Sequence, residues 1–120
     1  MDFRTIGAAL GMALLVLSSS SAAASSSSCD RPISRVERLV CASPDVRRLD
    51  AELGQLYDAI ESETRGIDGE TGRVADPFGE EHEHWLVHVR NRCDTDACLK
   101  TAYQARIAYV RQHWGSSLED

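Results

Sequence analysis

The chain has 120 residues, of which 19 are acidic and 13 are basic, so its formal net charge at pH 7 is −6. An acidic surface disfavours binding to nucleic acid and to anionic membranes, and it favours a basic protein partner. Four cysteines in a chain of this length suggest two disulfides if the protein is exported.

The first 24 residues have the features of a secretory signal peptide. Arg4 precedes an apolar run over Ile6–Leu17, and small residues follow up to Ala24. The run holds about 12 residues, fewer than the ~20 that span a bilayer. We therefore expect cleavage near Ala24, a disordered tail over residues 25–28, and a periplasmic or secreted protein without stable membrane insertion.

Two other fates of this segment stay open. Asp2 offsets the charge of Arg4, which leaves an uncleaved anchor as one alternative. Cys29 follows the small residues, as the lipid-bearing cysteine of a lipoprotein does. The sequence "SSSSC" lacks the leucine of the usual lipoprotein box, so a lipoprotein is the less favoured alternative.

Residues 29–114 are predicted to form one helical domain, followed by a flexible tail over residues 115–120. Signal cleavage leaves about 96 residues, whose core is small enough for cross-links to matter. Ser34 and Glu37 have the spacing of a capping box, and they open a short helix that ends near Cys41.

A long helix is predicted from Pro44 to about Glu63. Ser43 is suited to cap it, and Pro44 is suited to its first turn. Apolar residues recur at three- and four-residue steps, as the buried face of a helix requires. They are Val46, Leu49, Leu53, Leu56, Tyr57 and Ile60.

The stretch from Arg65 to Gly79 holds four glycines and one proline without periodicity. No part of the chain alternates as a strand would, and we predict a mobile loop of about 15 residues here. Loops of this length are uncommon in compact domains, and they are usually functional or disordered.

Two further helices follow. The first runs from about Glu80 to Arg92, and Asp96 is suited to cap the second after a short turn. The fold class is therefore a small, disulfide-bonded all-α bundle of three long helices plus one short N-terminal helix. The inward face of the last helix is expected to hold Leu99, Ala102, Tyr103, Ile107, Val110 and Trp114.

Cys93 and Cys98 are predicted to form a structural disulfide. Cys93 ends one predicted helix and Cys98 begins the next, so an antiparallel hairpin brings them within bonding distance. A thioredoxin-type redox pair would have two intervening residues rather than four. A zinc site would need Cys29 and Cys41 to converge on the same point. Redox chemistry and metal binding stay open as lesser alternatives.

Cys29 and Cys41 flank the short helix. We expect them to pair with each other, because the segment before the helix can run back alongside it. The two disulfides would close loops of about 13 and 6 residues, worth roughly 3 and 2 kcal/mol in the chain-entropy model.

Asp50, Arg90 and Arg106 are candidate polar residues of the core. Asp50 follows Leu49 and Arg90 follows Val89, so both lie beside an apolar stripe. We interpret them as a partly buried ion pair that bridges helices. No nucleophile has a base partner at a recognisable spacing and no phosphate-binding loop occurs, so we expect neither catalytic residues nor enzymatic activity.

His84 and His88 lie four residues apart, which places both on one helix face with Glu81 about a turn earlier. Such a set can bind zinc or copper. The HExxH motif is excluded because Trp85 follows His84. We expect a solvated helix face with neither metal nor cofactor. Metal buffering in the cell envelope is the alternative function.

The order of these segments resembles the N-terminal domain family of the LprI-type lysozyme inhibitors, small exported bacterial proteins. The resemblance rests on Cys29, "SRVERLVC", "SPDVRRLDAELGQLY", a Trp-Leu pair and "RNRCDTDACLKTAYQARI", and it covers most of residues 29–111. It departs at "HEH", where the family usually has a Gln-Arg pair. The resemblance implies a helical, disulfide-bonded domain of the cell envelope that binds and inhibits lysozyme.

The glycine-rich loop is the expected contact surface of such an inhibitor. Animal-type lysozymes are basic and hold two carboxylates in an open cleft, so an acidic protein would be steered towards them. We expect Asp68, Glu70 and Asp76 to meet the lysozyme, with Phe78 as an apolar anchor. The alternatives are an immunity-type or chaperone-like binder of another peptidoglycan hydrolase, and a loop that is merely solvated.

Overall fold

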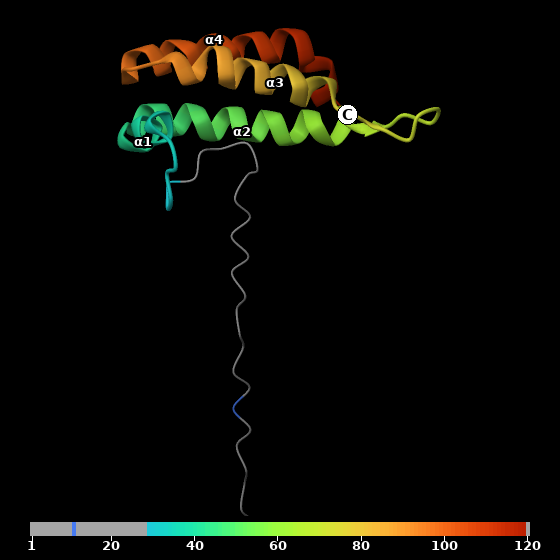
Figure 1. The fold of residues 1–120 in the computed structure, drawn as a ribbon, viewed down its shortest axis with the longest axis horizontal. Coiled ribbons are helices and arrows are strands. Elements are labelled where there is room, and N and C mark those ends of the chain that lie inside the picture. The colour runs from blue at the N-terminus through green and yellow to red at the C-terminus, as the bar shows by residue number, and fades with distance from the viewer. Residues whose placement is uncertain (1–10, 12–28, 120) are drawn as a thin grey trace, which may run out of the picture.

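The computed structural model describes Gly11 and residues 29–119. Apart from Gly11, the predicted signal peptide and serine tail lie outside the described residues. Four α-helices make up the domain, with two-residue strands and short 3₁₀ helices between and after them (Figure 1). In chain order the elements are α1 (Arg35–Ala42), α2 (Pro44–Thr64), β1 (Gly66–Ile67), β2 (Val74–Ala75), α3 (Pro77–His88), η1 (Arg90–Arg92), α4 (Asp96–Trp114) and η2 (Gly115–Leu118).

The predicted all-α, disulfide-bonded fold is confirmed. Helices α3 and α4 both pack against α2, and α1 packs at the N-terminal end of α2 (Figure 1). The core lies between these helices, where apolar side chains lose contact with water. Its buried members are Val36, Val40, Val46, Leu53, Leu56, Ile60, Phe78, Trp85, Cys93, Leu99, Tyr103, Ile107 and Val110.

The predicted inward faces of the two long helices account for most of this core. On α2, Leu49 and Tyr57 are only partly buried, and on α4 the same holds for Ala102 and Trp114. The other predicted positions on both helices are buried. Periodicity therefore located the core faces correctly, and the partly buried positions pack at their edges.

Hydroxyl caps begin three of the helices. The Ser34 hydroxyl accepts a hydrogen bond from the Glu37 backbone N–H at 3.1 Å, and the Ser43 hydroxyl accepts one from Val46 at 3.3 Å. Thr95, rather than the predicted Asp96, caps α4 by accepting from the Cys98 N–H. Asp96 is instead the first helical residue, where its charge favours the helix N-terminus.

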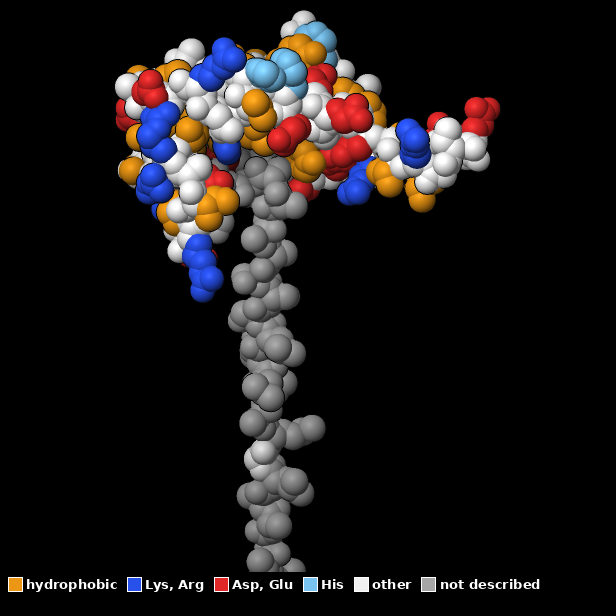
Figure 2. Space-filling model, in the orientation of Figure 1, with side chains coloured by type: hydrophobic (Ala, Val, Ile, Leu, Met, Phe, Trp, Pro, Cys, Tyr) orange, Lys and Arg blue, Asp and Glu red, His pale blue; other side chains and the backbone are white. Residues whose placement is uncertain are grey.

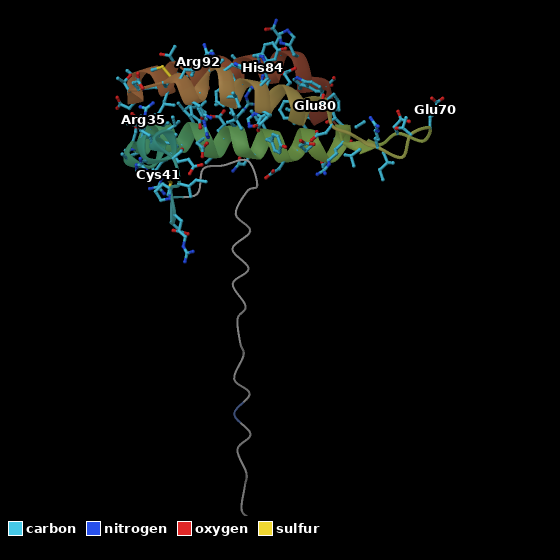
Figure 3. The ribbon with its side chains drawn as sticks, in the orientation of Figure 1. Arg35, Cys41, Glu70, Glu80, His84 and Arg92 are labelled. Atoms are coloured by element: carbon cyan, nitrogen blue, oxygen red, sulfur yellow. A yellow bond between two sulfur atoms is a disulfide. The ribbon has the colours of Figure 1, made fainter. Side chains whose placement is uncertain are left out.

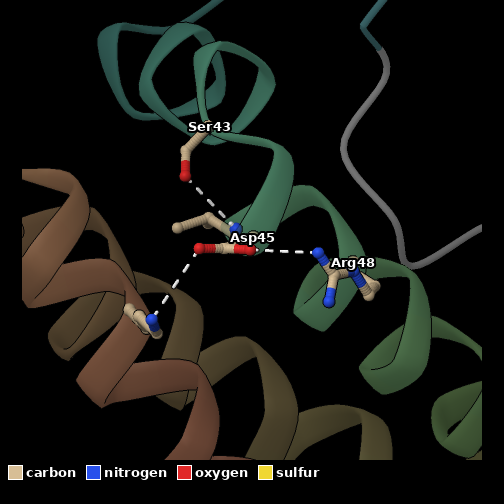
Figure 4. Close-up of polar contacts among 5 residues, drawn as sticks. Ser43, Asp45 and Arg48 are labelled. Atoms are coloured by element: carbon tan, nitrogen blue, oxygen red, sulfur yellow. Dashed lines mark hydrogen bonds and ion pairs between the residues drawn. The ribbon is translucent and has the colours of Figure 1, made fainter.

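Ion pairs join the start of α2 to α4. The Asp45 carboxylate accepts a hydrogen bond from the Arg48 guanidinium at 3.0 Å and lies 3.8 Å from the Lys100 ammonium (Figure 4). These side chains are at least half exposed, so each pair contributes little to stability.

Both predicted disulfides are present. Cys29 bonds to Cys41 and Cys93 bonds to Cys98, with 5.5 Å between the Cα atoms in each pair. The first ties the segment before α1 to the last turn of that helix, and the second closes the turn between η1 and α4. Such local cross-links are typical of small domains in oxidising compartments. No helix in the described part of the chain is long and apolar enough to cross a membrane.

The prediction of an irregular loop over residues 65–79 is wrong. Residues 66–75 form a β-hairpin, in which Gly66 pairs with Ala75 and Ile67 pairs with Val74. Two backbone hydrogen bonds close the turn. The Asp68 N–H donates to the Arg73 carbonyl oxygen, and the Gly72 N–H donates to the Asp68 carbonyl oxygen, each at 2.8 Å. One turn residue, Gly72, has φ +68°, a conformation that glycine adopts without the steric cost of a Cβ atom.

The end of the chain also differs from the prediction. Residues 115–118, expected to begin a flexible tail, form η2, which packs against α2 and α4. Leu118 is the apolar residue that holds it, because its side chain packs against the core. The domain therefore extends beyond the predicted boundary at residue 114.

Candidate functional site

The hairpin of residues 66–75 projects from the end of the helical bundle and carries the most accessible part of the predicted contact surface (Figure 1). Glu70 lies at its far end (Figure 3). Ile67 and Val74 are 75% and 56% exposed, although both are β-branched apolar residues. They face each other as cross-strand partners. An exposed apolar pair of this kind is suited to burial against a partner.

Asp68 holds the turn of the hairpin. One of its carboxylate oxygens accepts hydrogen bonds from the backbone N–H groups of Glu70 and Thr71, at 2.8 and 3.1 Å. These bonds favour the ionised form and lower the pKa of Asp68. Asp68 therefore stays charged and organises the tip, while Glu70 presents its carboxylate to solvent. Figure 2 shows acidic side chains at the tip, with hydrophobic and basic ones nearer its base.

Asp76 and Phe78 lie at the start of α3 rather than in the hairpin, and the prediction of Phe78 as an exposed apolar anchor is wrong. Asp76 caps α3, and one of its carboxylate oxygens accepts from the Gly79 N–H at 3.0 Å. Phe78 is fully buried, with its ring centroid 5.0 Å from Trp114 and 5.5 Å from Tyr57. Phe78 belongs to α3, which begins at Pro77, and it lies on the same helix face as the buried His82 and Trp85. Ile67 and Val74, not Phe78, are the exposed apolar residues next to the acidic tip.

The predicted polar core divides into two groups. The buried Asp50 carboxylate accepts a 2.7 Å hydrogen bond from the Tyr103 hydroxyl. Arg90 is also buried, and its Nε donates to Asn91 at 3.0 Å. Burial raises the pKa of Tyr103, and the charge of Asp50 raises it further, while Arg90 lowers it. Tyr103 therefore stays protonated and keeps its role as donor.

Arg106 belongs to the second group. Its Nη1 donates to the Glu81 carboxylate of α3 at 2.8 Å, so it forms an ion pair between α4 and α3. The same Glu81 oxygen accepts from the Trp114 indole N–H at 3.3 Å. Arg106 is buried, and its ion-pair partner is Glu81 rather than Asp50.

His84 and His88 are exposed on α3, with 4.3 Å between their ring centroids. The third ligand suggested for a metal, Glu81, is engaged by Arg106 and Trp114. Among the residues that the structure describes, no group of three His, Cys, Asp or Glu side chains is placed to hold a metal ion.

His82 is a buried residue that the sequence analysis missed. It is 4% exposed, and its ring lies 4.8 Å from Tyr57 and 5.7 Å from Trp85, measured between centroids. Neither ring nitrogen has a hydrogen-bond partner among the described residues. The burial of His82 could have been predicted from its spacing to Phe78 and Trp85, which places all three residues on one helix face.

No protein-family model matches the chain, and comparisons with curated proteins and with solved structures find no match either.

Proposed function

We propose that this chain is an exported protein-binding domain that inhibits a basic lysozyme by occluding its cleft. The observation that carries the proposal is the hairpin of residues 66–75, which extends past the bundle and presents the exposed Ile67 and Val74 beside the acidic Asp68 and Glu70. A narrow projection of this kind is suited to an open cleft. A periplasmic or extracellular location agrees with the two disulfides.

The two kinds of side chain on the hairpin have different roles in this proposal. Ile67 and Val74 supply the apolar contact that is desolvated on binding, and such central contacts carry most of the binding energy of an interface. Asp68 and Glu70, with the net charge of −6, steer the encounter with a basic enzyme. Losing the apolar pair should raise the dissociation rate, whereas losing the charges should lower the association rate.

The experiment is a peptidoglycan lysis assay with a basic animal-type lysozyme and the purified, oxidised domain. We expect stoichiometric inhibition and an association rate that falls as salt rises. Ile67→Ser with Val74→Ser should weaken inhibition at least tenfold, a change of about 1.4 kcal/mol. The matched control is Ile33→Ser, because Ile33 is 85% exposed and lies outside the hairpin.

Three outcomes bear on different parts of the proposal. Failure of the folded protein to inhibit several types of lysozyme would reject lysozyme as the target. Inhibition that survives the double serine variant would reject the hairpin as the site. Binding of another peptidoglycan hydrolase that depends on Ile67 and Val74 would keep the site and replace the target.

A further inference from the structure

An apolar groove runs along the surface between α3 and α4. It consists of two hollows of about 440 and 560 Å³, which share Val89 and Ala102 as lining residues. The first hollow contains Trp85 and Tyr109 in its lining, and the second reaches the Cys93–Cys98 disulfide. Volumes of this size are typical of small-molecule sites.

Small side chains of α4 form one side of this groove. Ala97 and Thr101 line the second hollow, and Ala105 lines the first. They recur every four residues and therefore lie on one face of the helix. The segment of α4 that lines the groove from Ala97 to Arg106 is about 13 Å long at 1.5 Å per residue.

Arg106 lines the first hollow with a guanidinium that is only partly satisfied. Its side chain is 5% exposed, and its Nη1 donates to Glu81. Its Nε and Nη2 are buried and have no acceptor among the described residues. The Nε–H and one Nη2–H of arginine point the same way, which suits two parallel hydrogen bonds to a carboxylate. A buried donor without an acceptor is costly, so a carboxylate at this edge would be favoured.

Aromatic rings surround the same guanidinium. The centroids of Phe78, Trp85 and Tyr109 lie 5.7, 5.9 and 5.4 Å from its central carbon. Phe78 is buried, whereas Tyr109 is 39% exposed and lines the hollow. Of the three rings, Tyr109 is the exposed one, so a carboxylate that reaches the buried Nε and Nη2 would have to displace an aromatic ring, and Tyr109 is the one bordering solvent.

We propose that this groove binds a medium-chain fatty acid, with its carboxylate on the Nε and Nη2 edge of Arg106. The alkyl chain would lie along Ala105 and Thr101 towards the Cys93–Cys98 disulfide, where the lining is mostly apolar, with Arg92 as its charged residue. The two N–H donors of Arg106 that lack an acceptor favour an anionic head. The elongated shape of the groove favours an alkyl chain over a compact ligand. An apolar helix of a protein partner would leave that edge unsatisfied.

The test measures binding of decanoate to the oxidised protein, below the concentration at which decanoate forms micelles. Calorimetry and tryptophan fluorescence should both show one saturable site, because Trp85 lines the groove. Decanol, which has the chain without the charge, should bind at least tenfold more weakly. Equal binding of decanol and decanoate would overturn the proposal, as would the absence of a saturable site in protein shown to be folded.

Substitutions in the groove locate the ligand. Ala105→Trp should weaken decanoate binding at least tenfold by filling the hollow, and Ala108→Trp is the matched control because Ala108 is exposed on the same helix outside the lining. Glu81→Gln should tighten binding about threefold or more, since it removes a like charge while keeping an acceptor for Arg106. Decanoate binding that is unchanged by Ala105→Trp, or capture of an amphipathic helical peptide with no binding of decanoate, would reject the proposal.

Discussion

The hydroxyl of Tyr103 donates a 2.7 Å hydrogen bond to the carboxylate of Asp50, and this bond joins α4 to α2 inside the core. Both residues are buried. A hydrogen bond to a charged, buried group is among the stronger ones in proteins, because the acceptor cannot recover a bond to water when the donor is lost.

Tyr103→Phe is therefore expected to destabilise the domain by about 1–3 kcal/mol, since it removes the donor while keeping the ring. Urea unfolding at pH 7 measures the effect. Tyr109→Phe is the matched control, because it makes the same chemical change at an exposed position of the same helix. A loss no larger than that of the control would show that Asp50 does not depend on this donor.

His82 is expected to make the domain sensitive to acid. Burial lowers the pKa of His82 from 6.5 to about 4, and the nearby charges of Arg106 and Arg90 act in the same direction. Between these pH values the unfolded chain binds a proton that the folded chain excludes. The contribution of neutral His82 to the free energy of unfolding is fully present above pH 6.5. It decreases by about 3 kcal/mol as the pH falls to about 4.

Urea midpoints measured from pH 7 to pH 4 test this dependence. His82→Leu should flatten the pH profile, because it removes the titrating group from the core. His84→Leu should leave the profile nearly unchanged, since His84 is exposed on the same helix. If the urea midpoint of His82→Leu falls with pH as steeply as that of the unmodified protein, groups other than His82 cause the acid sensitivity.

Gly79→Ala is expected to destabilise α3. A Cβ atom at this position would collide with the Asp76 carboxylate that caps the helix. Alanine normally stabilises a helix interior by about 1 kcal/mol relative to glycine, so a loss of about 1–2 kcal/mol would report the broken cap. Thermal unfolding measures it, with Gly69→Ala as the control because, apart from the adjoining residues, no atom lies within 4 Å of its added Cβ. Stabilisation by Gly79→Ala would contradict the cap.

The two disulfides should differ in their effect on stability. Replacing Cys29 and Cys41 by serine is expected to cost about 3 kcal/mol, and replacing Cys93 and Cys98 about 2 kcal/mol, because the shorter loop restricts the unfolded chain less. Urea unfolding of the two double variants provides the comparison. A larger loss from the second pair would indicate that the turn before α4 depends on its cross-link for native packing.

The helices were predictable to different degrees. The prediction for α2, Pro44 to about Glu63, agrees closely with the observed Pro44–Thr64, because a serine cap, a proline and a long apolar periodicity all point to the same boundaries. Helix α3 begins three residues before the predicted Glu80. The Asp76–Pro77 pair is a helix-start signal, but the glycines around it favoured a loop.

The candidate site was harder to predict from the sequence than the helices were. Arg106 and Glu81 are separated by 25 positions, so their pairing depends on how α4 packs beside α3 and not on any local spacing. The exposure of Ile67 and Val74 likewise depends on the hairpin extending beyond the bundle, since β-branched residues usually indicate burial. Local patterns predicted helices and disulfides, whereas tertiary packing decided which side chains remain available to a partner.

Each disulfide closes within one half of the chain, and the hairpin lies between the two halves. A single proteolytic nick after Arg73 would therefore leave two fragments with no covalent link, because the four cysteines are all used within the fragments. The fragments would stay together only through the packing of α2 against α3 and α4. Their reassembly would then be bimolecular, so the stability of the nicked protein would depend on its concentration and that of the intact chain would not.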